Sequence, residues 1–118
     1  MRNQGNKQTV GCVPTVLVTA HDPGGGEAVA QVAKMLSEHH NCNPISIIHP
    51  MCQPVFAQLG VRIDHLVSWN SSDNKKEATN LVRQANPALV VAGTSMGDTL
   101  DKLIIRVAKR ENIPTLSI

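Results

Sequence analysis

His21 and Asp22 are the residues of this sequence best placed for acid–base chemistry, because they directly follow an apolar run over residues 13–20. An imidazole titrates near neutral pH, and a neighbouring carboxylate orients it or binds a sugar hydroxyl. We therefore predict His21 and Asp22 as catalytic residues. For Asp22 a structural alternative stays open, in which its carboxylate accepts N–H bonds from its own turn before Pro23.

Three consecutive glycines, Gly24, Gly25 and Gly26, come next, where a helix is expected to begin. Glycine lets backbone approach a ligand closely, and the free N–H groups of a helix N-terminus attract phosphate. The run is not a Walker A loop, since no Gly-Lys-Ser/Thr follows, and Val29 replaces the third glycine of the dinucleotide fingerprint. We predict that these glycines bind a ligand; the alternative is a tight turn between strand and helix.

A second loop of small residues covers 93–99, and we predict ligand-binding roles for Thr94, Ser95, Gly97 and Asp98. Hydroxyls and amides ahead of a helix bind phosphate or sugar hydroxyls, although the same residue types also serve as helix caps. The loop formally matches Gly-x-Ser-x-Gly, but no histidine follows His65 in the chain. A nucleophilic Ser95 is therefore not expected.

Neither a metal nor a cofactor is predicted. His49 ends a strand on the same sheet edge as His21, but no tight ligand spacing accompanies it. The three cysteines, Cys12, Cys42 and Cys52, share no metal-ligand spacing, and their odd number indicates reduced thiols and a cytoplasmic protein. His65, inside an expected strand, is predicted to be a packing residue.

Apolar periodicity predicts five strands that alternate with four helices. The strands are expected at residues 13–20, 43–49, 61–69, 88–92 and 113–118. Three helices are expected where apolar residues recur at i, i+3, i+4 and i+7, starting from Val29, Ala78 and Leu100. Asp98 or Thr99 is expected to cap the last of these helices. A shorter helix is expected over 53–59. The third strand alternates more than the first, which indicates a position near an edge.

Strands joined by helices form a parallel sheet with right-handed crossovers, so we predict a three-layer α/β/α Rossmann-like domain. Two strand orders are compatible with the pattern, 3-2-1-4-5 and 2-1-3-4-5. The two small-residue loops follow strands one and four, and they flank the switch-point crevice only in the order 3-2-1-4-5. We therefore favour that order.

The composition fits one globular domain over residues 12–118 after a flexible leader over 1–11, within a chain of 118 residues. A net charge of +2, with Trp69 and Phe56 as the whole aromatic inventory, argues against nucleic acid as a partner. No apolar run has the length of a membrane span, so no membrane partner is expected.

With both loops placed, the chain resembles the N-terminal Rossmann-like half of GT-B glycosyltransferases and of the related UDP-GlcNAc 2-epimerases. The resemblance lies in the first strand with its His-Asp-Pro-Gly-Gly-Gly turn, in the stretch 88–98, and in the closing stretch 110–118. It implies a two-domain enzyme whose first half tends to bind the acceptor, whose second half binds the nucleotide sugar, and whose catalysis occurs between them. Because the sequence matches one half, we expect a second Rossmann-like subunit, a homodimer, or a binding domain without catalysis.

The function expected from these residues is binding of a nucleotide sugar or another phosphorylated ligand between Gly24–Gly26 and Thr94–Asp98, with no catalysis by the domain alone. If it has an activity, the resemblance implies a component of a glycosyltransferase or sugar epimerase. The alternative is an interaction module whose sheet edge another chain completes. A lesser alternative is a zinc-dependent GlcNAc deacetylase, since residues 16–22 faintly resemble that family's Ala-His-Pro-Asp-Asp-Glu strand end.

Overall fold

The computed structural model describes residues 13–39, 41–69 and 72–118. The leader predicted for residues 1–11, together with Cys12 and His40, lies outside the described residues. The elements follow one another as five strands with helices between them. They are β1 (Thr15–Ala20), α1 (Pro23–Ser37), β2 (Asn43–Ile48), η1 (Pro50–Cys52), α2 (Gln53–Gln58), β3 (His65–Leu66), α3 (Ser72–Ala85), β4 (Leu89–Ala92), α4 (Leu100–Arg110) and β5 (Thr115–Ser117).

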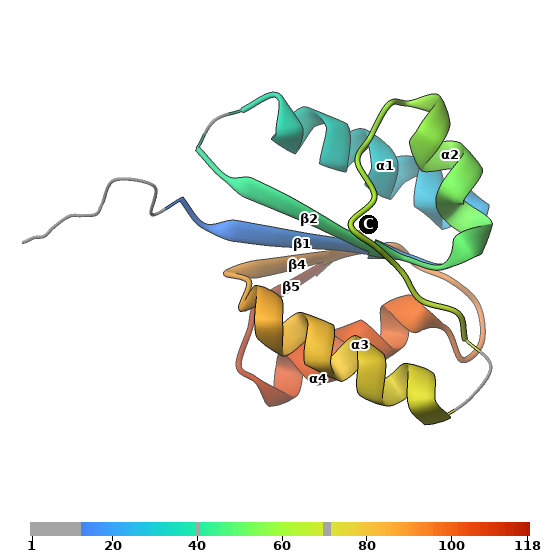
Figure 1. Cartoon of the computed structure of the whole chain (residues 1–118), viewed down its shortest axis with the longest axis vertical. Coiled ribbons are helices and arrows are strands. Elements are labelled where there is room, and N and C mark those ends of the chain that lie inside the picture. The colour runs from blue at the N-terminus through green and yellow to red at the C-terminus, as the bar shows by residue number, and fades with distance from the viewer. Residues whose placement is uncertain (1–12, 40, 70–71) are drawn as a thin grey trace, which may run out of the picture.

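The five strands form one parallel sheet in the order β3-β2-β1-β4-β5, which confirms the predicted three-layer Rossmann-like fold and its strand order. Helices α1 and α2 cover one face and helices α3 and α4 cover the other (Figure 1). Residues of β1 alternate between the two layers: Leu17 packs under α3 and α4, whereas Val16 and Val18 pack under α1. Because β1 is central, it is buried on both faces, as its nearly continuous apolar run predicted.

The third strand is much shorter than predicted. Only His65 and Leu66 pair with β2, although a strand was expected over 61–69. The carboxylate of Asp64 accepts a hydrogen bond from the Ser46 amide at 2.8 Å, and the Asp64 amide donates to the Ser46 carbonyl. The Asp64 side chain thereby takes the place of a backbone acceptor for the Ser46 amide, and the backbone pairing of β2 with β3 does not extend to this position. His65 is exposed on this edge strand, so the prediction of a packing residue is wrong.

No helix among the described residues is long and apolar enough to cross a membrane.

Candidate functional site

The candidate site lies at the carboxyl edge of the sheet, where β1, β2 and β4 end side by side. The strand order makes the loops after β1 and β4 neighbours, as predicted. The Gly93 amide donates to the Thr19 carbonyl at 3.0 Å, and the Asp22 amide donates to Ser95 Oγ at 3.4 Å. In an open α/β sheet this edge is where ligands bind.

The side chain of His21 caps a helix. Its Nδ1 atom accepts a hydrogen bond from the Leu100 amide at 3.0 Å, at the first residue of α4. The first amides of a helix have no partner within it, and here an imidazole from another strand supplies one. Since Nδ1 is the acceptor, the neutral ring carries its proton on Nε2.

His49 has the same arrangement at the end of the neighbouring strand. Its Nδ1 accepts a hydrogen bond from the Met51 amide at 3.1 Å, which caps the short helix η1. The rings of His21 and His49 stack, with centroids 4.0 Å apart and planes 21° from parallel. Burial lowers the pKa of His49, and the adjacent His21 lowers it further, whereas Asp22 opposes the shift.

Because both Nδ1 atoms accept cap bonds, each ring in its neutral form has an Nε2–H group that its cap bond does not use. Sequence reasoning placed His49 on the right edge but considered it only as a metal ligand. The signal for the pair is that each histidine follows the last residue of its strand, and Ala20 and Ile48 are direct partners in the sheet.

The three glycines lie in the first turn of α1, with Asp22 as the N-cap residue, and two of them are required by packing. A Cβ atom at Gly25 would lie 3.0 Å from the Thr94 carbonyl oxygen, and one at Gly26 would lie 2.6 Å from Cys52 Sγ. A Cβ at Gly24 would meet nothing within 4 Å. The close approach at Gly25 and Gly26 is thus to the protein itself, and Gly24 is the open position.

The N-terminus of α1 keeps free donors. The Asp22 side chain makes no cap hydrogen bond, so the alternative in which it satisfies its own turn is wrong. The Gly26 amide donates to the Asp22 carbonyl at 2.7 Å and is the first to bond within the helix. Pro23 has no N–H group, and among the residues that the structure describes the amides of Gly24 and Gly25 have no acceptor.

The N-terminus of α4, by contrast, is closed by protein groups. The Asp101 carboxylate is fully buried and accepts hydrogen bonds from Ser95 Oγ at 2.7 Å, from Thr99 Oγ1, and from the Lys102 amide at 2.8 Å. Thr99 is the N-cap residue by position, but its side chain makes no cap bond. An acidic residue in the first helical turn was the signal for this cluster, and sequence reasoning missed it.

The remaining predicted residues of the second loop lie at its surface. Thr94 donates to the Ile118 carbonyl at 3.2 Å, and the Asp98 carboxylate lies 3.7 Å from the Arg106 guanidinium. Gly97 has a φ of 84°, which favours glycine at that position. Ser95 is buried against Asp101, so the structure brings Ser95 to the β1 end and leaves Thr94 and Asp98 at the rim.

The thiol of Cys52 contacts the backbone of the turn after β1. Its Sγ lies 3.1 Å from the His21 carbonyl and 3.2 Å from the Asp22 carbonyl. Burial raises the pKa of this thiol to about 11, with smaller contributions from Asp22 and Asp101. The sulfur therefore stays protonated and donates its hydrogen to the turn.

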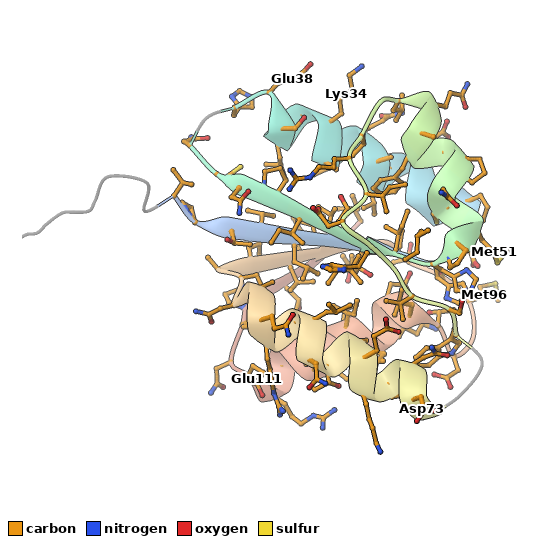
Figure 2. All side chains as sticks on the ribbon, viewed as in Figure 1. Lys34, Glu38, Met51, Asp73, Met96 and Glu111 are labelled. Carbon is orange, nitrogen blue, oxygen red and sulfur yellow. The ribbon has the colours of Figure 1, made fainter. Side chains whose placement is uncertain are left out.

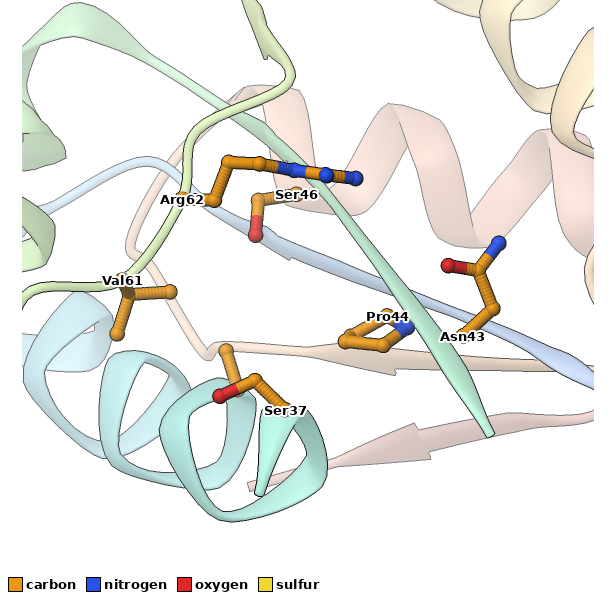
Figure 3. Close-up of a pocket in the computed structure, with 7 residues that line it drawn as sticks. Ser37, Asn43, Pro44, Ser46, Val61 and Arg62 are labelled. Carbon is orange, nitrogen blue, oxygen red and sulfur yellow. The ribbon is translucent and has the colours of Figure 1, made fainter. Parts of the chain in front are cut away.

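A separate cavity of about 240 Å³ lies at the amino end of β2, opposite the histidine pair (Figure 3). Asn43, Pro44 and Ser46 of β2 line it, together with Arg62. The Arg62 guanidinium already pairs with Asp64 at 2.9 Å. None of the predicted site residues lies there, and the chemistry of this chain gathers at the other end of the sheet.

No group of three or more metal-ligating side chains occurs within residues 13–39, 41–69 and 72–118. The zinc-hydrolase alternative therefore has no ligand set among these residues. Cys42 and Cys52 are both free thiols.

Several solved structures share this fold. The UDP-GlcNAc 2-epimerase from Neisseria meningitidis bound to UDP-GlcNAc matches with a TM-score of 0.72 and 19% identity, over 88% of this chain and 31% of that chain. MurG from Acinetobacter baumannii matches with a TM-score of 0.67 and 16% identity, over 88% of this chain and 34% of that chain. Methylglyoxal synthase from Elizabethkingia anophelis matches with a TM-score of 0.61 and 18% identity, over 90% of this chain and 72% of that chain.

These matches confirm the predicted resemblance to a Rossmann-like half of UDP-GlcNAc 2-epimerases and GT-B glycosyltransferases at the level of the fold. The chain spans about a third of the length of the epimerase and of MurG. No protein-family model matches the sequence, and no match to a curated protein was found.

Proposed function

We propose that this domain binds a nucleotide sugar, or another phosphorylated ligand, over the N-terminus of α1 and the histidine pair. One observation carries the proposal: α1 offers the unsatisfied amides of Gly24 and Gly25 at the switch-point edge of the sheet. Such a helix end attracts a phosphate through its N–H groups and its dipole. The N. meningitidis epimerase, which shares this fold over 31% of its length, was crystallised with UDP-GlcNAc bound.

The phosphate is assigned to α1 because α4 already holds a buried carboxylate at its N-terminus. Asp101 compensates the α4 dipole, and His21 occupies the Leu100 amide. A Cβ atom at Gly25 would lie 3.0 Å from the Thr94 carbonyl oxygen, so the two loops approach too closely to hold a ligand between them, and the ligand is assigned to the surface over both loops. This refines the predicted crevice without changing the residues that border it.

We assign His21 and His49 as hydrogen-bond donors to ligand oxygens through Nε2–H. The lone pair on His21 Nδ1 is committed to Leu100, which leaves donation as the natural role of the neutral ring. The Asp22 carboxylate, which does not cap α1, is assigned to a sugar hydroxyl. Thr94 and Asp98 border the ligand from the rim of the second loop.

Catalysis by the domain alone is not proposed. The epimerase and MurG are about three times as long as this chain, so the second half of such an enzyme is assigned to a partner domain or subunit.

The test is calorimetric titration of the protein with UDP-GlcNAc, UDP and inorganic phosphate, using two variants of Gly24. Gly24→Val places a branched side chain beside the free amides and should abolish binding. Gly24→Ala adds a single methyl group into open space and should keep the fold and most of the affinity. Absence of heat with all three ligands, or equal affinity of wild type and Gly24→Val, would contradict the proposal.

A second candidate function is self-association, in which a second copy of the chain docks on the β5 side of the sheet. Strand β5 is an edge strand, and Leu116 on it is 52% exposed. Met96, in the loop after the neighbouring strand β4, is 91% exposed (Figure 2). Light scattering of the wild type and of Leu116→Lys tests this, because a docked dimer should dissociate in the variant, whereas a monomeric wild type would exclude self-association.

A further inference from the structure

A basic groove lies on the outer side of the α3/α4 layer, away from the histidine pair. It has a volume of about 440 Å³ and is lined by Lys75, Lys76 and Arg83 from α3 and by Arg110 from α4. We propose that this groove binds an acidic polypeptide segment of a partner protein. The proposal is independent of the nucleotide-sugar site, because none of that site's residues lines the groove.

The cations are spaced to match carboxylates along a chain. Lys75 and Arg83 are eight positions apart in α3, which corresponds to about 12 Å along the helix axis at 1.5 Å per residue. Arg110, near the end of α4, lies at the Arg83 end of the groove, since Arg83 contacts the adjacent Glu111 at 3.4 Å. An extended peptide places side chains four residues apart at about 13 Å, so acidic residues at that spacing reach both ends.

Much of this positive charge is not neutralised within the protein. Among the described residues neither Lys76 nor Arg110 forms an ion pair with a carboxylate. Lys75 Nζ lies 5.9 Å from the centroid of the Trp69 ring, whereas Arg83 is paired with Glu111, donating to its Oε2 atom from Nε and from Nη2 at 3.4 Å each. The nearest other acidic residues on α3, Asp73 and Glu77, are not among the groove's lining residues.

The groove also supplies neutral hydrogen-bonding groups between its charged ends. Thr79 donates its hydroxyl proton to the Lys75 carbonyl at 2.8 Å, and Asn80 is exposed. An exposed carboxamide donates to a peptide carbonyl, whereas guanidinium groups bind carboxylates through paired N–H donors. Guanidinium groups together with the carboxamide of Asn80 suit a polypeptide ligand.

Other anionic partners fit the groove less well. No large apolar side chain of α3 or α4 is exposed among the described residues, so the surface lacks an anchor for a lipid bilayer. None of the described residues that line the groove has an aromatic ring to stack on bases. A second copy of the chain is a poor source of the segment. Its acidic residues at that spacing, Asp73 and Glu77, both lie within helix α3 and not in an extended segment.

The experiment is fluorescence anisotropy with a labelled ten-residue glutamate peptide at low and physiological salt. The groove variant is Lys76→Glu with Arg110→Glu. The matched control, Lys34→Glu with Lys109→Glu, changes the net charge equally at exposed positions outside the groove. We expect affinity to fall about tenfold or more in the groove variant and by no more than about twofold in the control.

Equal losses in the two variants would overturn the proposal, because they indicate general charge attraction. So would a wild type that does not bind the peptide. Parallel titrations use phosphatidylserine vesicles and a single-stranded oligonucleotide. If either of these binds more tightly than the peptide and loses its binding in the groove variant, the groove has another kind of partner and the proposal fails.

Discussion

The Nδ1 atom of His21 lies 3.0 Å from the amide nitrogen of Leu100, so a residue at the end of β1 caps a helix that begins 79 residues later. This bond ties the candidate site to the packing of α4 on the sheet. It also determines which ring nitrogen carries the proton. A change at His21 therefore affects stability as well as any ligand.

Replacing His21 with alanine should lower the free energy of unfolding by about 1–2 kcal/mol, because the Leu100 amide loses its acceptor. His21→Asn should recover much of this loss, since its amide oxygen can occupy the place of Nδ1. Urea unfolding of the three proteins measures the effect. If asparagine were no better than alanine, the cap would not be the reason for the loss.

The His49 pKa predicts how stability depends on pH. It is lowered in the folded protein from the ordinary value of 6.5, chiefly by burial. Between the lowered value and 6.5 the unfolded chain binds more protons than the folded protein, so stability rises with pH in that window. The contribution is fully present above 6.5 and is lost as the pH falls through the lowered pKa.

The measurement for this pH dependence is a series of urea unfolding curves from pH 5 to pH 8. His49→Asn keeps an acceptor for the Met51 amide but removes the titrating ring, and it should flatten the dependence. An unchanged pH profile in that variant would assign the effect to other groups.

Gly26 and Cys52 should show strong coupling. Gly26→Ala places a methyl carbon 2.6 Å from Cys52 Sγ and should cost about 1–3 kcal/mol of stability. Cys52→Ala removes the sulfur, and in the double variant the alanine at position 26 should be tolerated far better. Gly24→Ala is the control, expected to be neutral or stabilising because that position is open. A purely additive double variant would contradict the packing explanation.

Thr19 offers a site for stabilisation. Its side chain is fully buried, and its hydroxyl has no hydrogen-bond partner in the part of the chain that the structure describes. Thr19→Val keeps the shape and removes the unsatisfied polar group, so we expect a gain of about 1 kcal/mol in thermal or urea unfolding. A destabilised valine variant would show that the hydroxyl has a partner, such as a bound water.

Cys52 should be unreactive in the folded protein. Its thiol is buried and has a pKa of about 11, whereas Cys42 is partly exposed. Iodoacetamide at pH 8 should modify Cys42 well before Cys52, as peptide mapping by mass spectrometry will show. Both should react at similar rates in urea, which serves as the control. Rapid native labelling of Cys52 would indicate that the turn after β1 opens readily.

Much of the architecture could be predicted from periodicity, because burial on a strand or helix face leaves a local pattern. The central strands, the amphipathic helices α1, α3 and α4, and the two small-residue loops all follow from such patterns. The length of the third strand could not be predicted in this way. The alternation over 61–69 does not reveal that the Asp64 carboxylate, and not a backbone carbonyl, accepts the hydrogen bond from the Ser46 amide. A side chain that replaces a ladder bond has the same periodicity as one that faces solvent.

The sequence by itself determined the element order, the fold class and the placement of His21, Asp22, Gly24 and Thr94 at one edge of a parallel sheet. Only the tertiary structure decided what these residues contact: His21 caps α4, His49 stacks on it, and Asp101 closes the second helix end. The reason is physical. Periodicity reports which side of an element is buried, whereas hydrogen bonds between groups far apart in the chain depend on how the layers pack.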